Sequence, residues 1–301
     1  MRCIPACFTN IVAASLTGYT TQLNNGTTQG DPSSMLYCSF YNAPLIKVAS
    51  SEDKLSPGFI DDTMILVISN SIAQCHTKLK NMMERLGGCF EWSYMHNSPL
   101  ELTKTALMNF PRLYRVLIPG NLSLDKLNPD RSTTNSLTAP VASYKYLGVI
   151  FDPKLRWSLQ HTKALTTTSF WASRIWWLAK SASGVSTSGV KQLYNTVAVP
   201  RFTYSAKVWY TSLHHLNGSK NLHGSVKVTN KLCTAQRKIT KVIMGGLSTT
   251  AGDILNAHGY VLPIDLLFNK VLFCAALRLC SLPKSYPLRP LVWKIAHCKV
   301  K

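Results

Sequence analysis

Acidic residues are missing from a long part of this chain, and their distribution divides it in two. No Asp or Glu occurs in residues 153–252, and residues 153–301 hold 21 Lys and Arg against only two carboxylates. Residues 1–152 hold 12 basic and 11 acidic residues. Ordinary soluble surfaces mix both signs of charge. We therefore expect two units, a near-neutral one over 1–152 and a basic one over 153–301.

The net charge of +20 over 301 residues indicates a polyanionic partner, with nucleic acid the first candidate. Apolar residues make up 46% of the sequence, which is enough for a sizeable core and too much for a disordered tail. A solvated charged face without a partner is the alternative for the basic half. The near-absence of acids there disfavours it.

The nine cysteines and the short apolar runs predict an intracellular protein, with nucleus and cytoplasm both left open. The cysteine count is odd and no Cys-x-x-Cys pair occurs, so neither a disulfide framework nor a zinc site is indicated. Reduced thiols are the default for such a chain. No uninterrupted run of about 18 apolar residues occurs, so we expect no membrane span and no membrane partner.

Apolar periodicity predicts an α+β first unit. A helix is expected from Pro32, and it has an apolar face made of Met35, Leu36, Phe40 and Leu45. Two short strands are expected over 55–68, a helix over 71–86, and strands over 105–118 and 143–151. The second unit is predicted to be mostly helical, with helices near 158–180, 187–199, 226–244 and 264–281 and a polar connector over 212–225.

Two adjacent carboxylates, Asp61 and Asp62, stand at the expected turn of the apolar hairpin over 55–68. They repel each other, so the arrangement makes sense where a divalent cation neutralises them. Mg²⁺ prefers oxygen ligands, few protein carboxylates and substrate phosphates. Two-metal nucleotidyl transfer needs such a site, with one ion on the attacking 3′-hydroxyl and one on the leaving pyrophosphate. A plain turn is the alternative for the pair alone, because Asp is favoured in turns.

Three other motifs flank this pair in a definite order: Gln29-Gly30 upstream, and Lys104 and then Tyr146-Leu147-Gly148 downstream. Together the motifs resemble the palm of reverse transcriptases from LINE-like (non-LTR) retrotransposons of the jockey-like kind. The resemblance implies a partial polymerase palm over 1–152, an antiparallel sheet with helices. A mostly helical, basic connection and thumb region follows over 153–301. It also implies RNA-directed DNA polymerase activity, with an RNA template, a DNA primer, deoxynucleoside triphosphates and Mg²⁺.

The same resemblance implies roles for the matching residues. Gln29 and Gly30 would lie beneath the incoming nucleotide and the template base, and Ser34 matches the family at one of the positions that follow. Asp61 would be a metal ligand and Asp62 a second carboxylate with a lesser role.

Lys104 matches a lysine near the triphosphate, where it could neutralise developing charge or protonate pyrophosphate. Tyr146, Leu147 and Gly148 match the primer-grip hairpin, which holds the primer end against the metals. Taken singly, Lys104 also fits a solvent-facing lysine, and Leu147-Gly148 also fits an ordinary strand turn.

One part of the family pattern has no counterpart here. The family carries a further Asp before the Gln-Gly loop, and none of the 28 residues before Gln29 is acidic. We therefore expect a slice of a larger polyprotein that shows no efficient polymerase activity by itself. The alternative is an inactive retroelement remnant that at most binds nucleic acid. An unrelated basic RNA-binding protein would leave the ordered motifs unexplained.

The predicted helix over 226–244 is the strongest nucleic-acid-binding candidate in the basic half. Apolar residues recur at helical spacing on one side, and the other faces carry Lys227, Lys231, Arg237, Lys238 and Lys241. Such a helix can pack on one side and follow a phosphate backbone on another. Basic residues also interleave with Trp171, Trp176, Trp177 and Trp209. These rings could stack on bases, but packing in the core is the prediction.

Overall fold

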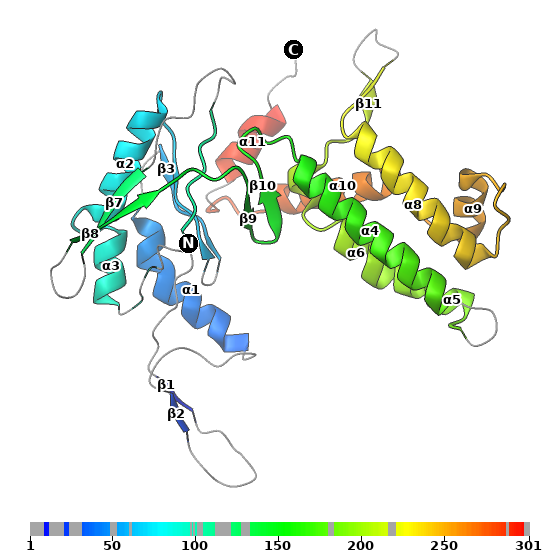
Figure 1. Ribbon diagram of the computed structural model, residues 1–301, viewed down its shortest axis with the longest axis horizontal. Coiled ribbons are helices and arrows are strands. Elements are labelled where there is room, and N and C mark those ends of the chain that lie inside the picture. Colours follow the sequence, from blue (N-terminus) through cyan, green and yellow to red (C-terminus); the bar gives the residue numbers. More distant parts are fainter. Residues whose placement is uncertain are drawn as a thin grey trace. The chain divides into compact units, whose positions relative to one another are not determined.

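The computed structural model divides the chain into two compact units, Met1–Leu155 and Arg156–Lys301. It describes residues 9–11, 21–23, 32–48, 53–59, 62–96, 98, 100, 105–111, 122–127, 133–179, 184–215, 221–286 and 289–297. The division falls close to Asp152, where the charge composition of the sequence changes. Helices occur together with small antiparallel sheets, so the fold is mixed α and β (Figure 1).

The first unit combines three helices with five two-stranded antiparallel sheets in its described part. The helices are α1 (Pro32–Lys47), α2 (Ile72–Glu84) and α3 (Cys89–Met95). The strand pairs are β1 (Thr9–Ile11) with β2 (Thr21–Leu23), β3 (Lys54–Leu55) with β6 (Leu66–Val67), β4 (Gly58–Phe59) with β5 (Asp62–Thr63), β7 (Leu122–Leu127) with β8 (Thr133–Thr138), and β9 (Tyr144–Tyr146) with β10 (Val149–Phe151).

Helix α2 contributes Met83 to the core of this unit. The prediction of a helix over 71–86 is confirmed. The Ser71 hydroxyl accepts a hydrogen bond from the backbone N–H of Gln74 at 3.2 Å, which satisfies one of the free donors at the helix start. The core joins α1, α2, α3 and β7 through Leu45, Val48, Met83, Cys89, Trp92, Leu100, Leu107, Leu122 and Leu124.

The predicted apolar face of the first helix is wrong. Leu45 is buried, but Met35, Leu36 and Phe40 are exposed, and the inward side instead carries Cys38, Asn42 and Leu45. Positions 38, 42 and 45 share one face of a helix of 3.6 residues per turn, whereas 36 and 40 point away from it. Met35 falls on the same side as Asn42 but lies exposed in the first turn of the helix.

Two predicted strands also differ from the structure. Residues 105–111 form no strand; Leu107 makes one isolated parallel bridge with Pro140, and the rest of the predicted strand over 105–118 lies outside the described residues. The predicted single strand over 143–151 is a hairpin, because the chain reverses at Leu147 and Gly148. Strand pairing depends on long-range partners, which a local apolar pattern does not identify.

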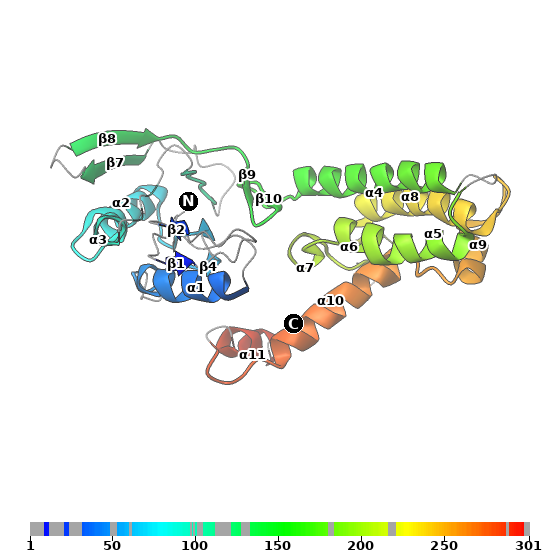
Figure 2. The same ribbon diagram turned by 90° about the horizontal axis from the view of Figure 1, so that it is seen from below.

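The second unit is helical, as predicted. Its elements are α4 (Ser158–Leu178), α5 (Thr187–Leu193), the π-helix η2 (Tyr194–Ala198), α6 (Val199–Phe202), α7 (Ala206–Trp209), α8 (Val226–Met244), α9 (Gly252–Gly259), α10 (Ile264–Cys280) and α11 (Arg289–His297). Helices α4 and α8 lie side by side (Figure 1, Figure 2). The predicted connector over 212–225 also contains a short hairpin, β11 (His214–His215) with β12 (Leu222–His223).

Aromatic rings and neutral hydrogen bonds hold the core of the second unit. The fully buried Phe268 stacks on Tyr210, with ring centroids 4.2 Å apart, and meets Trp209 edge-on at 5.5 Å. The buried Gln236 donates from Nε2 to the Tyr194 hydroxyl at 3.0 Å and to the Leu262 carbonyl at 2.8 Å. Burial raises the pKa of Tyr194 to about 12, although the hydrogen bond from Gln236 acts in the opposite direction.

No individual helix in the described part of the chain is both long and apolar enough to cross a membrane. The neighbours α9 and α10 meet that criterion only when taken together, across a bend of 54°.

We predict that Gln236→Leu lowers the free energy of unfolding by about 1–3 kcal/mol, because the Leu262 carbonyl and the Tyr194 hydroxyl both lose their donor. Urea unfolding followed by circular dichroism measures the change. The matched control is Gln192→Leu at an exposed position, for which the expected change is within about 0.5 kcal/mol. Equal effects of the two variants would contradict the assigned role of Gln236.

Candidate functional site

Asp62 belongs to an antiparallel hairpin, and the described residues of 55–68 pair as the predicted hairpin does. Between the two strand pairs, the Met64 N–H donates to the Pro57 carbonyl at 2.9 Å. At the open end of the hairpin, the Ile68 N–H donates to the backbone carbonyl of Asp53 at 2.8 Å. In this register Asp62 lies opposite Phe59. Asp62 is half-buried, and Asp61 lies outside the described residues.

Helix α2 holds this carboxylate hairpin (residues 53–68) in place. The Lys78 ammonium pairs with the Asp53 carboxylate at 2.5 Å, and the Cys75 thiol donates to the Val67 carbonyl at 3.8 Å. Both contacts join α2 to the open end of the hairpin. The strand that carries Asp62 is therefore held through the base of the hairpin.

The candidate primer-grip residues form the turn of a second hairpin, β9–β10. Its two turn residues, Leu147 and Gly148, have φ of 44° and 80°. Two-residue turns with positive φ at both positions match the right-handed twist of the flanking strands. Glycine adopts this conformation freely, but a leucine costs about 1–2 kcal/mol there. Leu147, one of the three residues that the sequence resemblance matches to the primer grip, is thus a strained position.

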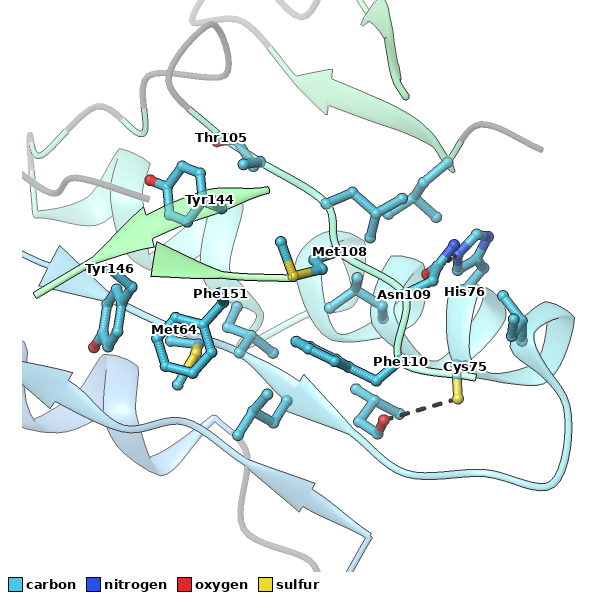
Figure 3. A pocket seen from close by; sticks show the side chains of 18 of the residues that line it. Met64, Cys75, His76, Thr105, Met108, Asn109, Phe110, Tyr144, Tyr146 and Phe151 are labelled. Atoms are coloured by element: carbon cyan, nitrogen blue, oxygen red, sulfur yellow. Dashed lines mark hydrogen bonds between the residues drawn. The ribbon is translucent and has the colours of Figure 1, made fainter. Parts of the chain in front are cut away.

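The two hairpins meet around one cavity of about 410 Å³. Met64 from the first and Tyr144, Tyr146 and Phe151 from the second line it, together with α2 (Figure 3). The pKa of the Tyr146 phenol is raised, chiefly by burial and then by the negative charge of Asp62 and by Tyr144. Asp62 and Tyr146 are far apart in sequence, and the fold brings them within electrostatic range.

The walls of this cavity are largely apolar. Its most polar side holds His76 and Asn109, whose Nε2 and Oδ1 atoms lie 2.9 Å apart. The Asn109 amide nitrogen and the Thr63 hydroxyl are buried and have no hydrogen-bond partner among the described residues. Sequence reasoning missed the His76–Asn109 pair, since the two residues come from separate elements and no motif links them.

Asp62 offers the type of ligand that Mg²⁺ prefers, a carboxylate oxygen. Where the structure describes the chain, no group of three or more His, Cys, Asp or Glu side chains could enclose a metal ion. An ion bound at Asp62 would therefore take most of its ligands from outside this set, as Mg²⁺ does when substrate phosphates and water complete its shell.

The remaining predicted residues of the first unit are placed only in part. Ser34 lies half-buried in the first turn of α1. Gln29, Gly30, Asp61 and Lys104 lie outside the described residues. The described part of the predicted site thus consists of Asp62 and the Tyr146-Leu147-Gly148 hairpin, which come together, and Ser34.

Helix α8 presents four of its five predicted basic residues as one stripe. At about 100° of rotation per residue, Lys227, Lys231, Lys238 and Lys241 fall within about 80° of one another. Three of them are exposed and Lys241 is half-buried. The opposite face is buried through Val228, Leu232 and Ile239. No acidic residue occurs on this helix or on α4, so this lysine stripe forms a positive surface.

Arg237 lies outside the lysine stripe. Its Nη2 atom donates to the carbonyls of Thr250 at 2.8 Å and Ser248 at 3.3 Å, so it holds the loop that follows α8. It remains exposed to solvent.

The prediction that the four tryptophans pack in the core is confirmed for Trp209 and is wrong for two others. Trp209 is buried and Trp171 packs partly against the core, but Trp176 and Trp177 are exposed. Consecutive residues on a helix point about 100° apart, so Ile175, Trp176 and Trp177 cannot all face the core. Ile175 takes the buried position. This spacing was the sequence signal that could have identified the exposed pair.

Comparison with known proteins gives no relative for this chain: no family model, curated protein or solved structure matches it.

We predict that Leu147→Asn is more stable than Leu147→Ala by about 1 kcal/mol. Both changes remove the leucine side chain, but asparagine tolerates the left-handed backbone that alanine does not. Thermal unfolding of the two variants measures the difference. Equal stability would show that no strain resides at this turn.

Proposed function

We propose that this chain is the palm and thumb part of an RNA-directed DNA polymerase of the LINE-like, non-LTR kind. In this proposal the two hairpins position a primer end beside Asp61 and Asp62, and α8 follows the phosphate backbone of the template–primer. The observation that supports it most is the cavity that both hairpins line, because it joins two motifs whose order in the sequence resembles that family.

The chain's own residues would act mainly by positioning. Tyr146 and the Leu147-Gly148 turn would hold the primer terminus, and Lys104 would offset negative charge on the triphosphate. Gln29, Gly30 and Ser34 would lie along the incoming nucleotide and the template base.

The proposed cofactor is Mg²⁺, with Asp61 and Asp62 as its protein ligands. When bound, it supplies activation of the 3′-hydroxyl and neutralisation of the leaving pyrophosphate. The Tyr146 phenol, whose pKa is raised chiefly by burial, is protonated near neutral pH and can donate a hydrogen bond.

A second candidate function is nucleic-acid binding without polymerisation. The lysine stripe on α8 supports it, because this surface needs none of the residues of the carboxylate hairpin. The two candidates differ in one respect: only the first requires recognition of a primer end by the first unit.

We predict that the chain prefers a recessed primer–template over a blunt duplex of equal length, and that Tyr146→Ala removes this preference without changing duplex affinity. Competition binding in Mg²⁺ measures both. Tyr94→Ala, an exposed tyrosine on α3, is the control and should keep the preference. Equal affinity of the unaltered chain for the two substrates would contradict the polymerase proposal and leave the binding proposal standing.

We predict that affinity for duplex falls steeply with salt, and that Lys227→Ala and Lys231→Ala each reduce the slope of log K against log salt by about 0.9. Lys270→Ala on α10 removes the same charge outside the stripe and should leave the slope nearly unchanged. A flat salt response of the unaltered chain would contradict both candidate functions.

A further inference from the structure

A groove runs between α4 and α8 in the second unit. It encloses about 690 Å³, within the range of about 300–1,000 Å³ that is typical of small-ligand pockets. Small residues, among them Ala172, Ser173 and Ala235, form part of its lining, so a flat group can approach the helix backbones closely. We call this the α4–α8 groove.

Two adjacent tryptophans stand at one end of the groove. Trp176 and Trp177 both line it, yet their side chains are 59% and 60% exposed. Their rings meet edge to face, with centroids 5.8 Å apart. Removing apolar ring surface from water is favourable, so a ligand that covers one of these rings is favoured. The groove therefore offers an aromatic platform.

The side of the groove formed by α8 carries two lysines. Lys238 and Lys241 of the lysine stripe line the groove from α8. No Asp or Glu occurs anywhere in residues 153–252, so the field in the groove is positive and suits an anionic ligand.

The C-terminal ends of both helices lie near the tryptophans and contribute partial negative charge. Lys241, in the last turn of α8, offsets it. Phosphates are thus favoured beside the lysines, and an uncharged ring beside the tryptophans.

We propose that the α4–α8 groove binds single-stranded nucleic acid, with an unpaired base stacked on Trp176 and the adjoining phosphates between Lys238 and Lys241. Base–aromatic stacking joined to a basic groove is the general mode of single-strand binding. Inside a duplex each base is already stacked on both faces, so only the terminal pairs offer a free face to the tryptophan. This inference rests on the proposed nucleic-acid binding of the second unit and does not depend on polymerase chemistry.

The test is titration of the full chain with oligo(dT), with oligo(U) and with a blunt duplex, followed by tryptophan fluorescence and by competition. Trp176→Ala is expected to weaken single-strand binding between about 5-fold and 100-fold and to leave duplex binding unchanged. Trp176→Phe should retain most of the single-strand affinity, because its ring still stacks. The control is Trp293→Ala, an equally exposed tryptophan (57%) on α11, which should change neither.

The outcomes separate the two proposals. Loss of single-strand affinity in Trp176→Ala but not in Trp293→Ala supports the groove, and circular dichroism confirms that both variants fold. If both ligands bind but Trp176→Ala weakens them equally or not at all, the groove inference is wrong and the proposed function survives. If neither ligand binds the unaltered chain, the nucleic-acid function itself fails.

Two further comparisons in the same experiment identify the ligand. Equal loss for oligo(dT) and oligo(U) assigns the site to the features that the two share, the pyrimidine ring and the phosphate, whereas loss for one alone assigns it to the sugar or the 5-methyl group in which they differ. Displacement by poly-glutamate as effective as displacement by oligo(dT) would overturn the proposal, because the groove would then recognise charge without a base.

Discussion

An excess of positive charge, with 21 Lys and Arg against two carboxylates, is the constraint on which the second unit depends. With only Asp253 and Asp265 available in residues 153–301, this unit has few ion pairs open to it. Its core accordingly relies on aromatic packing around Phe268 and on neutral hydrogen bonds such as those of Gln236. The lysines of α8 are directed to the surface, where they repel one another. A bound polyanion would relieve that repulsion, and the same charge distribution therefore connects the fold to the proposed function.

The first unit depends instead on two β-hairpins that line one cavity together with helix α2. Contacts from α2 fix the carboxylate hairpin at its open end, and the β9–β10 hairpin closes over the same cavity with a strained leucine at its turn. A flexible loop could not keep Asp62 and Tyr146 within electrostatic range. Both residues lie on short paired strands, as the proposed positioning of a primer end would require.

Features set by local sequence could be predicted, and features set by distant partners could not. Helix α2 has its serine cap, and α8 has a regular apolar spacing, so both were predictable from neighbouring residues. Residues 105–111 looked like a strand, but a strand needs an edge to pair with, and Leu107 finds only a single bridge. The carboxylate hairpin and its Asp62 were predictable. The His76–Asn109 contact was not, because it depends on how whole elements pack.

The central claim is that the two hairpins of the first unit receive a primer end. Photo-crosslinking tests it most directly, with a 4-thiothymidine at the primer 3′ terminus of a template–primer bound to the full chain, followed by peptide mass spectrometry. The account predicts crosslinks within residues 53–68 and 144–151, which are lost when the thymidine analogue is moved to the middle of the duplex. Crosslinks confined to residues 156–301, or independent of the position of the analogue, would contradict it.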